Sequence, residues 1–310
     1  MHQPVLVKEV VENLVTRNSE IIVDATVGTG GHAEAILKGF EGKLICLDRD
    51  QDALTISEER LRLFENRITF ARLRFSQLED FFSGLKIKQV SGFLFDLGLC
   101  WLHLSSPQRG FSFQSDGPLD MRMDQSQKKT AFDVINRYSL SELTTVLFGF
   151  GQERFSKKIA RAIVDRRTKT PLHTTFQLRS LVESAVDPRF RIKSLARVFQ
   201  ALRMEVNDEL NELKEGLMQA IRFLAPLGRL CVISYHSLEH RLVKDKFRQE
   251  SRGCICPPDL PVCGCGAKAT LRVLTSKPLI ASSSEGESNP NSRSAKLWVA
   301  EKLELSTDER

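Results

Sequence analysis

The sequence predicts an α/β protein whose doubly wound sheet is interrupted by an inserted, all-helical domain. Short runs rich in Val, Ile and Leu recur at βαβ spacing over the first hundred residues, and three of them end at Asp24, Asp48 and Asp96. From about residue 131 to residue 224 the pattern is helical, and strand character then returns. The chain is therefore expected to leave the sheet, build a helical domain and come back to complete the sheet.

Each element of the first part follows from a local pattern. The apolar run 21–23 is followed by a glycine-rich turn and by a helix over residues 32–37. Further strands are expected over residues 43–47, 68–73 and 92–95. A loop rich in Ser, Pro, Gly and Asp then covers residues 104–125.

The middle of the chain carries two helix-start signals. Ser139 with Glu142, and Thr174 with Gln177, match the capping box, in which each side chain satisfies a backbone N–H of the other residue. After this region, strands are expected over 229–235, 270–274 and 297–303, a helix from about residue 238, and a mobile loop over 282–294. The predicted domains are a first core part, 1–109, an inserted helical domain, 110–205, and a second core part, 206–310.

Composition excludes several classes of protein. With 310 residues, 41% of them hydrophobic and 27% charged, the chain can bury a core and is not expected to be disordered. It shows no signal-peptide pattern, and no apolar run approaches the ~20 residues that span a bilayer. Seven cysteines are too few for a disulfide scaffold at this length. We expect a cytoplasmic protein with no membrane partner.

The net charge of +6 is unevenly distributed. Residues 151–200 contain twelve Lys and Arg but only four Asp and Glu, so this segment carries +8 and the rest of the chain −2. A concentrated basic region is typical of a surface that binds a polyanion, although a solvated helix face is the alternative. We expect Arg166, Arg167 and Lys169 to contact phosphates there, giving affinity rather than sequence choice.

The turn over residues 24–32, Asp-Ala-Thr-Val-Gly-Thr-Gly-Gly-His, follows a strand and precedes a helix. Its glycines permit positive φ and close approach of a ligand, and the helix start offers free N–H groups. Asp48, at the end of the next strand, can accept hydrogen bonds from both hydroxyls of a ribose. A dinucleotide and S-adenosylmethionine both fit. Asp24 favours S-adenosylmethionine, because a carboxylate suits the methionine ammonium and opposes a pyrophosphate.

Longer motifs resemble the RsmH family, also called MraW, nearly from end to end. Besides the turn and the preceding residues 2–6, they are Leu47-Asp-Arg-Asp50, Arg109-Gly-Phe-Ser-Phe113, Asp116-Gly-Pro-Leu-Asp-Met-Arg-Met123, Phe199-Gln-Ala-Leu-Arg-Met-Glu-Val-Asn207, Ile233-Ser-Tyr-His-Ser-Leu-Glu239 and Ser292-Arg-Ser-Ala-Lys296. The resemblance implies a Rossmann-like, S-adenosylmethionine-dependent methyltransferase core with an inserted helical domain. It also implies N(4)-methylation of a cytidine in the decoding region of 16S ribosomal RNA of the small ribosomal subunit, with a homodimer left open.

The resemblance also assigns roles to single residues. It places Gly30, Gly31 and His32 on the cofactor turn, Asp48 on the ribose, and Phe75 on the adenine. The complete predicted cofactor set is Asp24, Gly28, Gly30, Gly31, His32, Asp48, Phe75, Asp96 and His103.

The chain departs from the family directly after Asp96. The family continues Asp-Leu-Gly-Val-Ser-Ser, with glutamine two residues later, whereas this chain has Asp96-Leu-Gly-Leu-Cys-Trp-Leu-His103. His103 can still donate or accept a hydrogen bond and is expected to keep a cofactor contact. Cys100 replaces a serine, and Trp101 can stack on a nucleobase, although packing is the favoured role.

Asp96 is the predicted catalytic residue. A cytosine amino group is a poor nucleophile, so transfer requires alignment with the sulfonium methyl and an acceptor for the amino hydrogens. A carboxylate at the carboxyl end of the strand over 92–95 supplies such an acceptor, and no metal is required. Secondary candidates for positioning RNA or shaping the pocket are Asp116, Asp120, Arg122, Asn207 and His236.

Two further features leave alternatives open. Cys254 with Cys256, and Cys263 with Cys265, form two C-x-C pairs, which either a structural zinc ion or a loop of free thiols explains. The glycine turn alone also suits an NAD-dependent oxidoreductase, and the altered segment after Asp96 suits a noncatalytic RNA-binding assembly factor that keeps the cofactor pocket.

Overall fold

A computed structural model of the protein describes residues 4–252, 256, 264–265 and 267–304. These residues divide into two units, which we call the sheet unit and the helical unit. The sheet unit comprises the chain up to Gly98 and again from Leu210, and the helical unit runs from Leu99 to Glu209. The predicted insertion, residues 110–205, falls within the helical unit.

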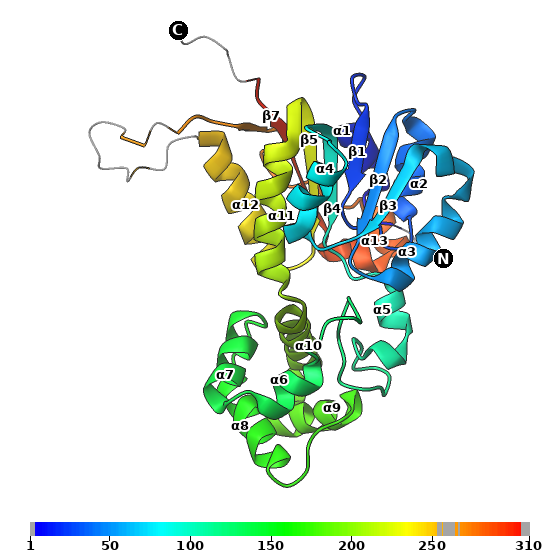
Figure 1. The fold of residues 1–310 in the computed structure, drawn as a ribbon. Helices are drawn as coiled ribbons and strands as arrows, with labels where there is room; N and C mark the ends of the chain where they lie inside the picture. The colour runs from blue at the N-terminus through cyan, green and yellow to red at the C-terminus, as the bar shows by residue number, and fades with distance from the viewer. Residues whose placement is uncertain (1–3, 253–255, 257–263, 266, 305–310) are drawn as a thin grey trace. The chain divides into compact units, whose positions relative to one another are not determined.

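The described part of the sheet unit contains one seven-stranded sheet in the order β3-β2-β1-β4-β5-β7-β6 (Figure 1). The strands are β1 (Ile21–Asp24), β2 (Lys43–Asp48), β3 (Ile68–Arg72), β4 (Val90–Asp96), β5 (Leu224–Ser234), β6 (Leu271–Val273) and β7 (Lys296–Lys302). The first five pair in parallel, whereas β7 runs antiparallel to both β5 and β6. Every strand predicted from the sequence is present.

Helices cover both faces of this sheet. They are α1 (Val7–Leu14), α2 (Gly31–Gly39), α3 (Gln51–Arg60), α4 (Leu78–Gly84), α11 (Glu209–Phe223), α12 (Ser237–Arg252) and α13 (Ser283–Ser288), with short 3-10 helices η1 (Arg62–Arg67), η2 (Phe75–Gln77) and η5 (Pro290–Ser294). Because strand side chains alternate between faces, Ile22 and Leu94 pack with α1 and α2, whereas Val23 and Phe93 pack with α4, α11 and α12. Burial on both faces explains the nearly continuous apolar runs of these strands.

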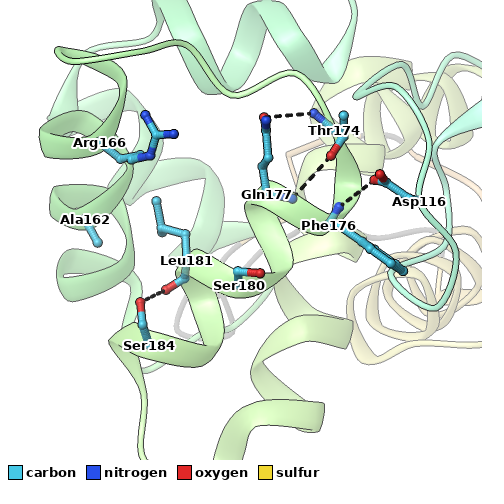
Figure 2. A pocket seen from close by; sticks show the side chains of 9 residues that line it. All are labelled: Asp116, Ala162, Arg166, Thr174, Phe176, Gln177, Ser180, Leu181 and Ser184. Atoms are coloured by element: carbon cyan, nitrogen blue, oxygen red, sulfur yellow. Dashed lines mark hydrogen bonds between the residues drawn. The ribbon is translucent and has the colours of Figure 1, made fainter.

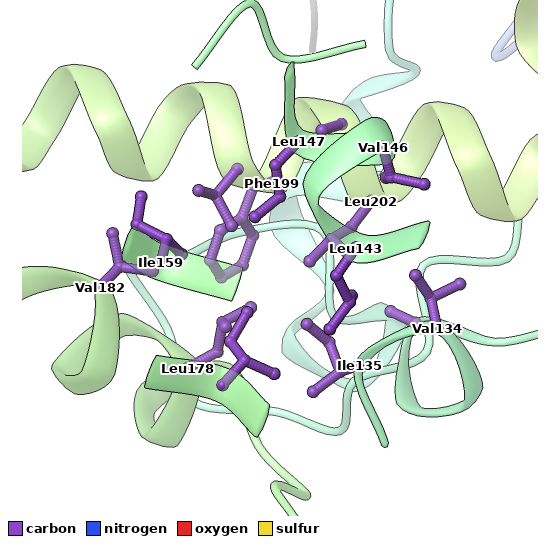
Figure 3. Packing of buried hydrophobic residues seen from close by; sticks show 14 of the residues in the cluster. Val134, Ile135, Leu143, Val146, Leu147, Ile159, Leu178, Val182, Phe199 and Leu202 are labelled. Atoms are coloured by element: carbon purple, nitrogen blue, oxygen red, sulfur yellow. The ribbon is translucent and has the colours of Figure 1, made fainter. Parts of the chain in front are cut away.

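The helical unit contains α5 (Trp101–Ser105), η3 (Pro107–Arg109), α6 (Ala131–Arg137), α7 (Leu140–Gly149), α8 (Ser156–Arg167), α9 (Thr175–Ala185), η4 (Pro188–Phe190) and α10 (Arg191–Asn207). Both predicted capping boxes are confirmed, because Ser139 and Thr174 accept hydrogen bonds from the N–H groups of Glu142 and Gln177. Side chains such as Leu143, Ile159 and Leu202 form the hydrophobic core of the helical unit (Figure 3). This core is separate from the two cores of the sheet unit.

One predicted segment differs from the structure. Residues 282–294 were expected to form a loop, but they contain α13 and η5, so that prediction is wrong. Ser282 caps α13 by accepting a hydrogen bond from the N–H of Glu285, and Glu285 Oε1 accepts another from the N–H of Leu6, at 2.8 Å. The second contact links residues far apart in the chain, which explains why local composition misses the helix.

None of the helices in the described ranges combines the length and the apolar character needed to cross a bilayer.

Candidate functional site

Three carboxylates lie at the carboxyl ends of adjacent parallel strands in the sheet unit. Asp24 ends β1, Asp48 ends β2 and Asp96 ends β4, and β1 pairs with both of the other strands. Ligands of open α/β sheets bind at this edge. The structure therefore brings together three side chains that the sequence predicts as site residues.

The glycine turn is attached to Asp48. Gly28 and Gly30 have φ values of 50° and 82°, in the left-handed region that favours glycine. The N–H of Gly28 donates to Asp48 Oδ2 at 2.9 Å, and Oδ1 accepts from the N–H of Asp50 at 2.9 Å. Each carboxylate oxygen has two lone pairs, so the oriented group can also accept from the two hydroxyls of a ribose. Gly31 is tightly enclosed, because a β-carbon there would lie 3.0 Å from the ring of Pro4.

Asp24 has the most unusual environment of the three acids. Its side chain is buried, and Oδ1 accepts from the N–H of Thr26 at 3.1 Å, while Oδ2 has no hydrogen-bond partner among the described residues. Burial, together with the nearby Asp96 and Asp48, raises the pKa of the Asp24 carboxyl to about 8. A bound cation would restore the carboxylate and use the second oxygen. This acid therefore fits the methionine ammonium.

Asp96 is held from three sides. Its N–H donates to Thr26 Oγ1 at 2.7 Å, and Oδ1 accepts from the N–H of Gly98 at 3.2 Å. Nδ1 of the buried His32, in the first turn of α2, lies 3.5 Å from Oδ2 of Asp96. On its other side, His32 Nε2 lies 2.8 Å from the carbonyl oxygen of Val5. The carboxylate of Asp96 therefore has a fixed direction.

Tyr235 is a site residue that the sequence prediction missed. Burial, the charge of Asp96 and a hydrogen bond to Asp96 raise the pKa of the Tyr235 hydroxyl. Its backbone N–H donates to Glu239 Oε2 at 2.9 Å, which fixes the chain after β5. The available signal was the position of Tyr235 directly after a strand that neighbours β4, because the ends of parallel neighbours meet at one edge. His236, a secondary candidate, lies 2.9 Å from Glu239 Oε1.

Phe75 lies in η2, directly after β3. Its ring meets that of Phe95 edge-on with a centroid separation of 5.1 Å. A β-carbon at Gly216 in α11 would stand 2.7 Å from Phe75 Cβ, so the glycine allows this close packing. The neighbours of Phe75 thus hold it in place, and its contact with adenine stays a prediction.

The substituted segment belongs to the helical unit. His103 is buried and stacks on Phe111 with a centroid separation of 4.7 Å. This contact gives His103 a packing role, and its predicted cofactor contact is untested. Trp101 is 52% exposed, so the expected packing role for this side chain is wrong. Cys100 is partly exposed.

The other secondary candidates hold the loop before α6. Asp120 and Arg122 form an ion pair at 2.7 Å, and Asn207 joins the loop by accepting from the N–H of Met123 and donating to the carbonyl of Met121. Asp116 accepts hydrogen bonds from the N–H groups of Gly117 and Phe176. These contacts make all four side chains parts of the internal framework of the helical unit.

The cysteine prediction is untested. Of the four cysteines in the two C-x-C pairs, Cys254 and Cys263 lie outside the described residues.

A parallel sheet with an antiparallel β7, a glycine turn and a row of acids for a nucleoside cofactor defines a Rossmann-like methyltransferase. The chain belongs to the MraW methylase family, whose model matches residues 1–303. Membership confirms the predicted family, fold class and cofactor, S-adenosylmethionine.

Relatives of high similarity cover nearly the whole chain. Proteins named ribosomal RNA small subunit methyltransferase H from Caldicellulosiruptor saccharolyticus and Carboxydothermus hydrogenoformans are each 47% identical, covering 97% of this chain and 99% and 98% of their own lengths. Similar solved structures include a methyltransferase from Streptococcus mutans in complex with SAH. It has a TM-score of 0.43 and 12% identity, and the match covers 98% of this chain and 100% of that chain.

Proposed function

We propose that the protein transfers the methyl group of S-adenosylmethionine to the exocyclic N4 of a cytidine in the decoding region of small-subunit (16S) ribosomal RNA. The relatives named above are small-subunit ribosomal RNA methyltransferases, which supports RNA as the substrate. One structural observation carries the chemistry: the carboxylate of Asp96 lies beside His32 of the glycine turn and is oriented by hydrogen bonds from Gly98 and Tyr235.

The residues at the sheet edge fit the cofactor. Asp24 offers a buried oxygen without a partner among the described residues, which suits a cationic ammonium. Asp48 would accept from the ribose, and Phe75 would contact the adenine. When bound, S-adenosylmethionine supplies an electrophilic methyl group on a sulfonium, which is a good leaving group. The glycines let the backbone of the turn approach it closely.

Asp96 has the electrostatic role. As N4 uses its lone pair, positive charge develops on the nitrogen, and a preorganised carboxylate stabilises that charge by accepting an amino hydrogen bond. The contacts from Gly98 and Tyr235 hold the carboxylate before the reaction, so little reorganisation is needed at the moment of transfer. Alignment of N4 with the methyl group supplies the rest of the rate increase.

The helical unit supplies cations for RNA phosphates, but not all of its basic residues are available. Arg167 donates to the carbonyl oxygens of Ile135 and Tyr138, so it stabilises the end of α6 instead of facing a ligand. This contact argues against the expected phosphate role of Arg167. Exposed cations on α8 that pair with no carboxylate of the described residues include Lys157, Lys158 and Arg161. They favour phosphate contact from this helix.

A groove between α8 and α9 lies on the same unit (Figure 2). Its volume is about 700 Å³, and its lining includes Arg166 and the ring of Phe176, which is 40% exposed. A guanidinium and an exposed aromatic ring that line one groove suit unpaired nucleotides, because the ring offers a stacking surface for a base and the cation meets a phosphate. We infer that this groove takes part in RNA contact.

The proposal is tested by incubating hypomethylated small ribosomal subunits with the protein and labelled S-adenosylmethionine, followed by nucleoside mass spectrometry. We expect N4-methylcytidine with the wild type and at least a hundredfold less with Asp96→Asn, since this change removes the charge from the site. RNA binding without transfer by the wild type would favour a noncatalytic assembly factor. Label in another nucleoside would disprove the cytidine assignment.

A further inference from the structure

A chain of hydrogen bonds leads from Glu285 in α13 to the ring of His32, which faces Asp96 at the edge of the sheet. The peptide group between Val5 and Leu6 is its centre, because its N–H donates to Glu285 Oε1 at 2.8 Å and its carbonyl oxygen lies 2.8 Å from His32 Nε2. His32 Nδ1 then faces Asp96 Oδ2 at 3.5 Å. A peptide that donates to a carboxylate becomes a better acceptor at its carbonyl, so the bonds reinforce one another.

This chain determines where His32 holds its protons. A carbonyl oxygen only accepts, so Nε2 must be the nitrogen that carries hydrogen when the ring is neutral. Nδ1 then presents a lone pair to the carboxylate of Asp96, and the contact becomes attractive when a proton enters between the two groups. The positions of Asp96 and His32 therefore favour the state in which the two groups together hold one additional proton.

We propose that His32 receives, through Asp96, the proton that the substrate nitrogen loses on methylation, and that Glu285 is a positioning residue for this step. The proposal rests on the proposed function, in which N4 of a cytidine is the nucleophile. It changes the predicted role of His32 from a cofactor contact to a proton acceptor.

The step balances in atoms and charge. The bond from N4 to the methyl carbon forms while the carbon–sulfur bond breaks, and the sulfur keeps the electron pair of the broken bond. N4 gives up one proton to Asp96, which passes a proton to His32 Nδ1. The neutral product keeps one N4 hydrogen, and the positive charge that was on sulfur ends as an imidazolium beside a carboxylate. No oxidant, reductant or metal ion is needed.

The surroundings favour this outcome. Asp96 on β4 and Glu285 on α13 place negative charge toward the two ends of the His32 ring, through the contacts described above. Asp24 on β1 lies close to Asp96, and Tyr235 after β5 donates to it. No Lys or Arg of the described residues makes an ion pair with Asp96, so the imidazolium is the cation that the site itself can provide.

Two substitutions of His32 separate its ring nitrogens. In His32→Gln the side-chain amide reaches the Nε2 position and can keep the bond to Val5, while the base at Nδ1 is removed. We expect kcat to fall by about 100-fold, the Kd for S-adenosylmethionine to stay within about threefold, and the acidic limb of the kcat profile to disappear. His32→Asn, which keeps a polar atom near the Nδ1 position and removes the Val5 bond, shows whether breaking that bond disturbs cofactor binding. A Kd that rises in His32→Gln as far as kcat falls would overturn the proposal, because His32 would then be a cofactor ligand.

A variant of Glu285 tests the remote end of the chain. Glu285→Gln can still accept from Leu6 but removes the charge, so we expect the acidic limb of the kcat profile to move to lower pH. Glu287→Gln, on the exposed side of the same short helix, is the matched control and should leave the profile unchanged. Equal profiles for both variants would remove Glu285 from the mechanism.

A readout in the free protein keeps this inference separate from the proposed function. ¹⁵N NMR of labelled histidine should show neutral His32 with its hydrogen on Nε2, whichever RNA is the substrate. Hydrogen on Nδ1 would overturn the inference even if the enzyme methylates cytidine. Conversely, if the wild-type protein did not methylate cytidine, the proposed function would be disproved, but the tautomer of His32 measured by NMR would still stand.

Discussion

The ring of Tyr235 lies where a side chain at Gly98 would have to stand: a β-carbon on Gly98 would be 2.9 Å from the ring. Separations below 3.0 Å are not sustained, so the glycine and the tyrosine are spatially coupled. Since the N–H of Gly98 donates to Asp96 and the hydroxyl of Tyr235 also bonds to Asp96, this pair of residues determines where the carboxylate of Asp96 points. Gly98 of the Asp-Leu-Gly motif is thus required for a steric reason: a larger residue would collide with the ring of Tyr235.

Gly98→Ala tests this coupling. We expect the methyl group at position 98 to displace the Tyr235 ring and lower kcat by about tenfold or more, because displacement of a positioned group weakens transition-state stabilisation. The Kd for S-adenosylmethionine, measured by calorimetry, should change little, since the turn and Asp48 are untouched. Gly84→Ala is the control, because a β-carbon at Gly84 has open space around it. Unchanged kcat in Gly98→Ala would show that the position of Tyr235 does not matter.

We expect Asp24 to make the binding of S-adenosylmethionine dependent on pH. Its carboxyl is raised to a pKa of about 8, so near pH 7 the free protein holds it mostly protonated, and the cationic cofactor favours the ionised form. Binding should therefore release a proton below pH 8, and affinity should increase as pH rises toward 8. Calorimetry in buffers of different ionisation enthalpy measures the proton release. Asp24→Asn should bind S-adenosylmethionine at least tenfold more weakly than the wild type and release no proton on binding. If the variant released as many protons as the wild type, Asp24 would not be the residue that binds the ammonium.

The same pKa predicts a stability effect of definite sign. In the folded protein the Asp24 carboxyl titrates near 8, but in the unfolded chain near its ordinary value of 3.8, so the folded state binds more protons between these values. The contribution of Asp24 to folding is thus fully present below about pH 4 and is lost as pH rises through about 8. In thermal unfolding of the cofactor-free protein, the melting temperature of Asp24→Asn should rise relative to that of the wild type as pH increases from 5 to 9. Parallel curves would contradict this.

The sequence predicts the sheet well because its strands are buried on both faces and therefore read as apolar runs, as in Val23 and Phe93. It also predicts Asp24, Asp48 and Asp96, since each ends a strand. It misses Tyr235 and Glu285, whose importance depends on contacts with Asp96 and Leu6 across the fold. The position of Tyr235 after a strand is visible in the sequence, but the partners of both side chains are distant in the chain and become apparent only in the fold.

Charge alone likewise does not distinguish a basic side chain that is available to a ligand from one that makes structural contacts within the protein. Arg166 and Arg167 are neighbours with the same charge, but Arg166 lines the groove whereas Arg167 is used internally to cap α6. The same limit applies to Asp120 and Arg122, which match the family motif but pair with each other. Three-dimensional contacts are needed to tell these roles apart.

The exposed cations of α8 should set the salt dependence of RNA binding. Replacing Lys157, Lys158 and Arg161 by Gln removes three charges without disturbing an ion pair of the described residues. For each phosphate that the variant no longer neutralises, the slope of log K against log salt should fall by roughly 0.7 to 0.9, while the Kd for S-adenosylmethionine stays the same.

Arg167→Gln provides the contrast for that triple variant. It removes one charge but also leaves the carbonyl oxygens of Ile135 and Tyr138 without this donor, so we expect a lower melting temperature with a smaller change of slope. Filter binding at several salt concentrations and thermal unfolding measure the two effects. If the triple variant kept the wild-type slope, Lys157, Lys158 and Arg161 would not contact RNA phosphates, and this part of the excess charge would be a solvated surface.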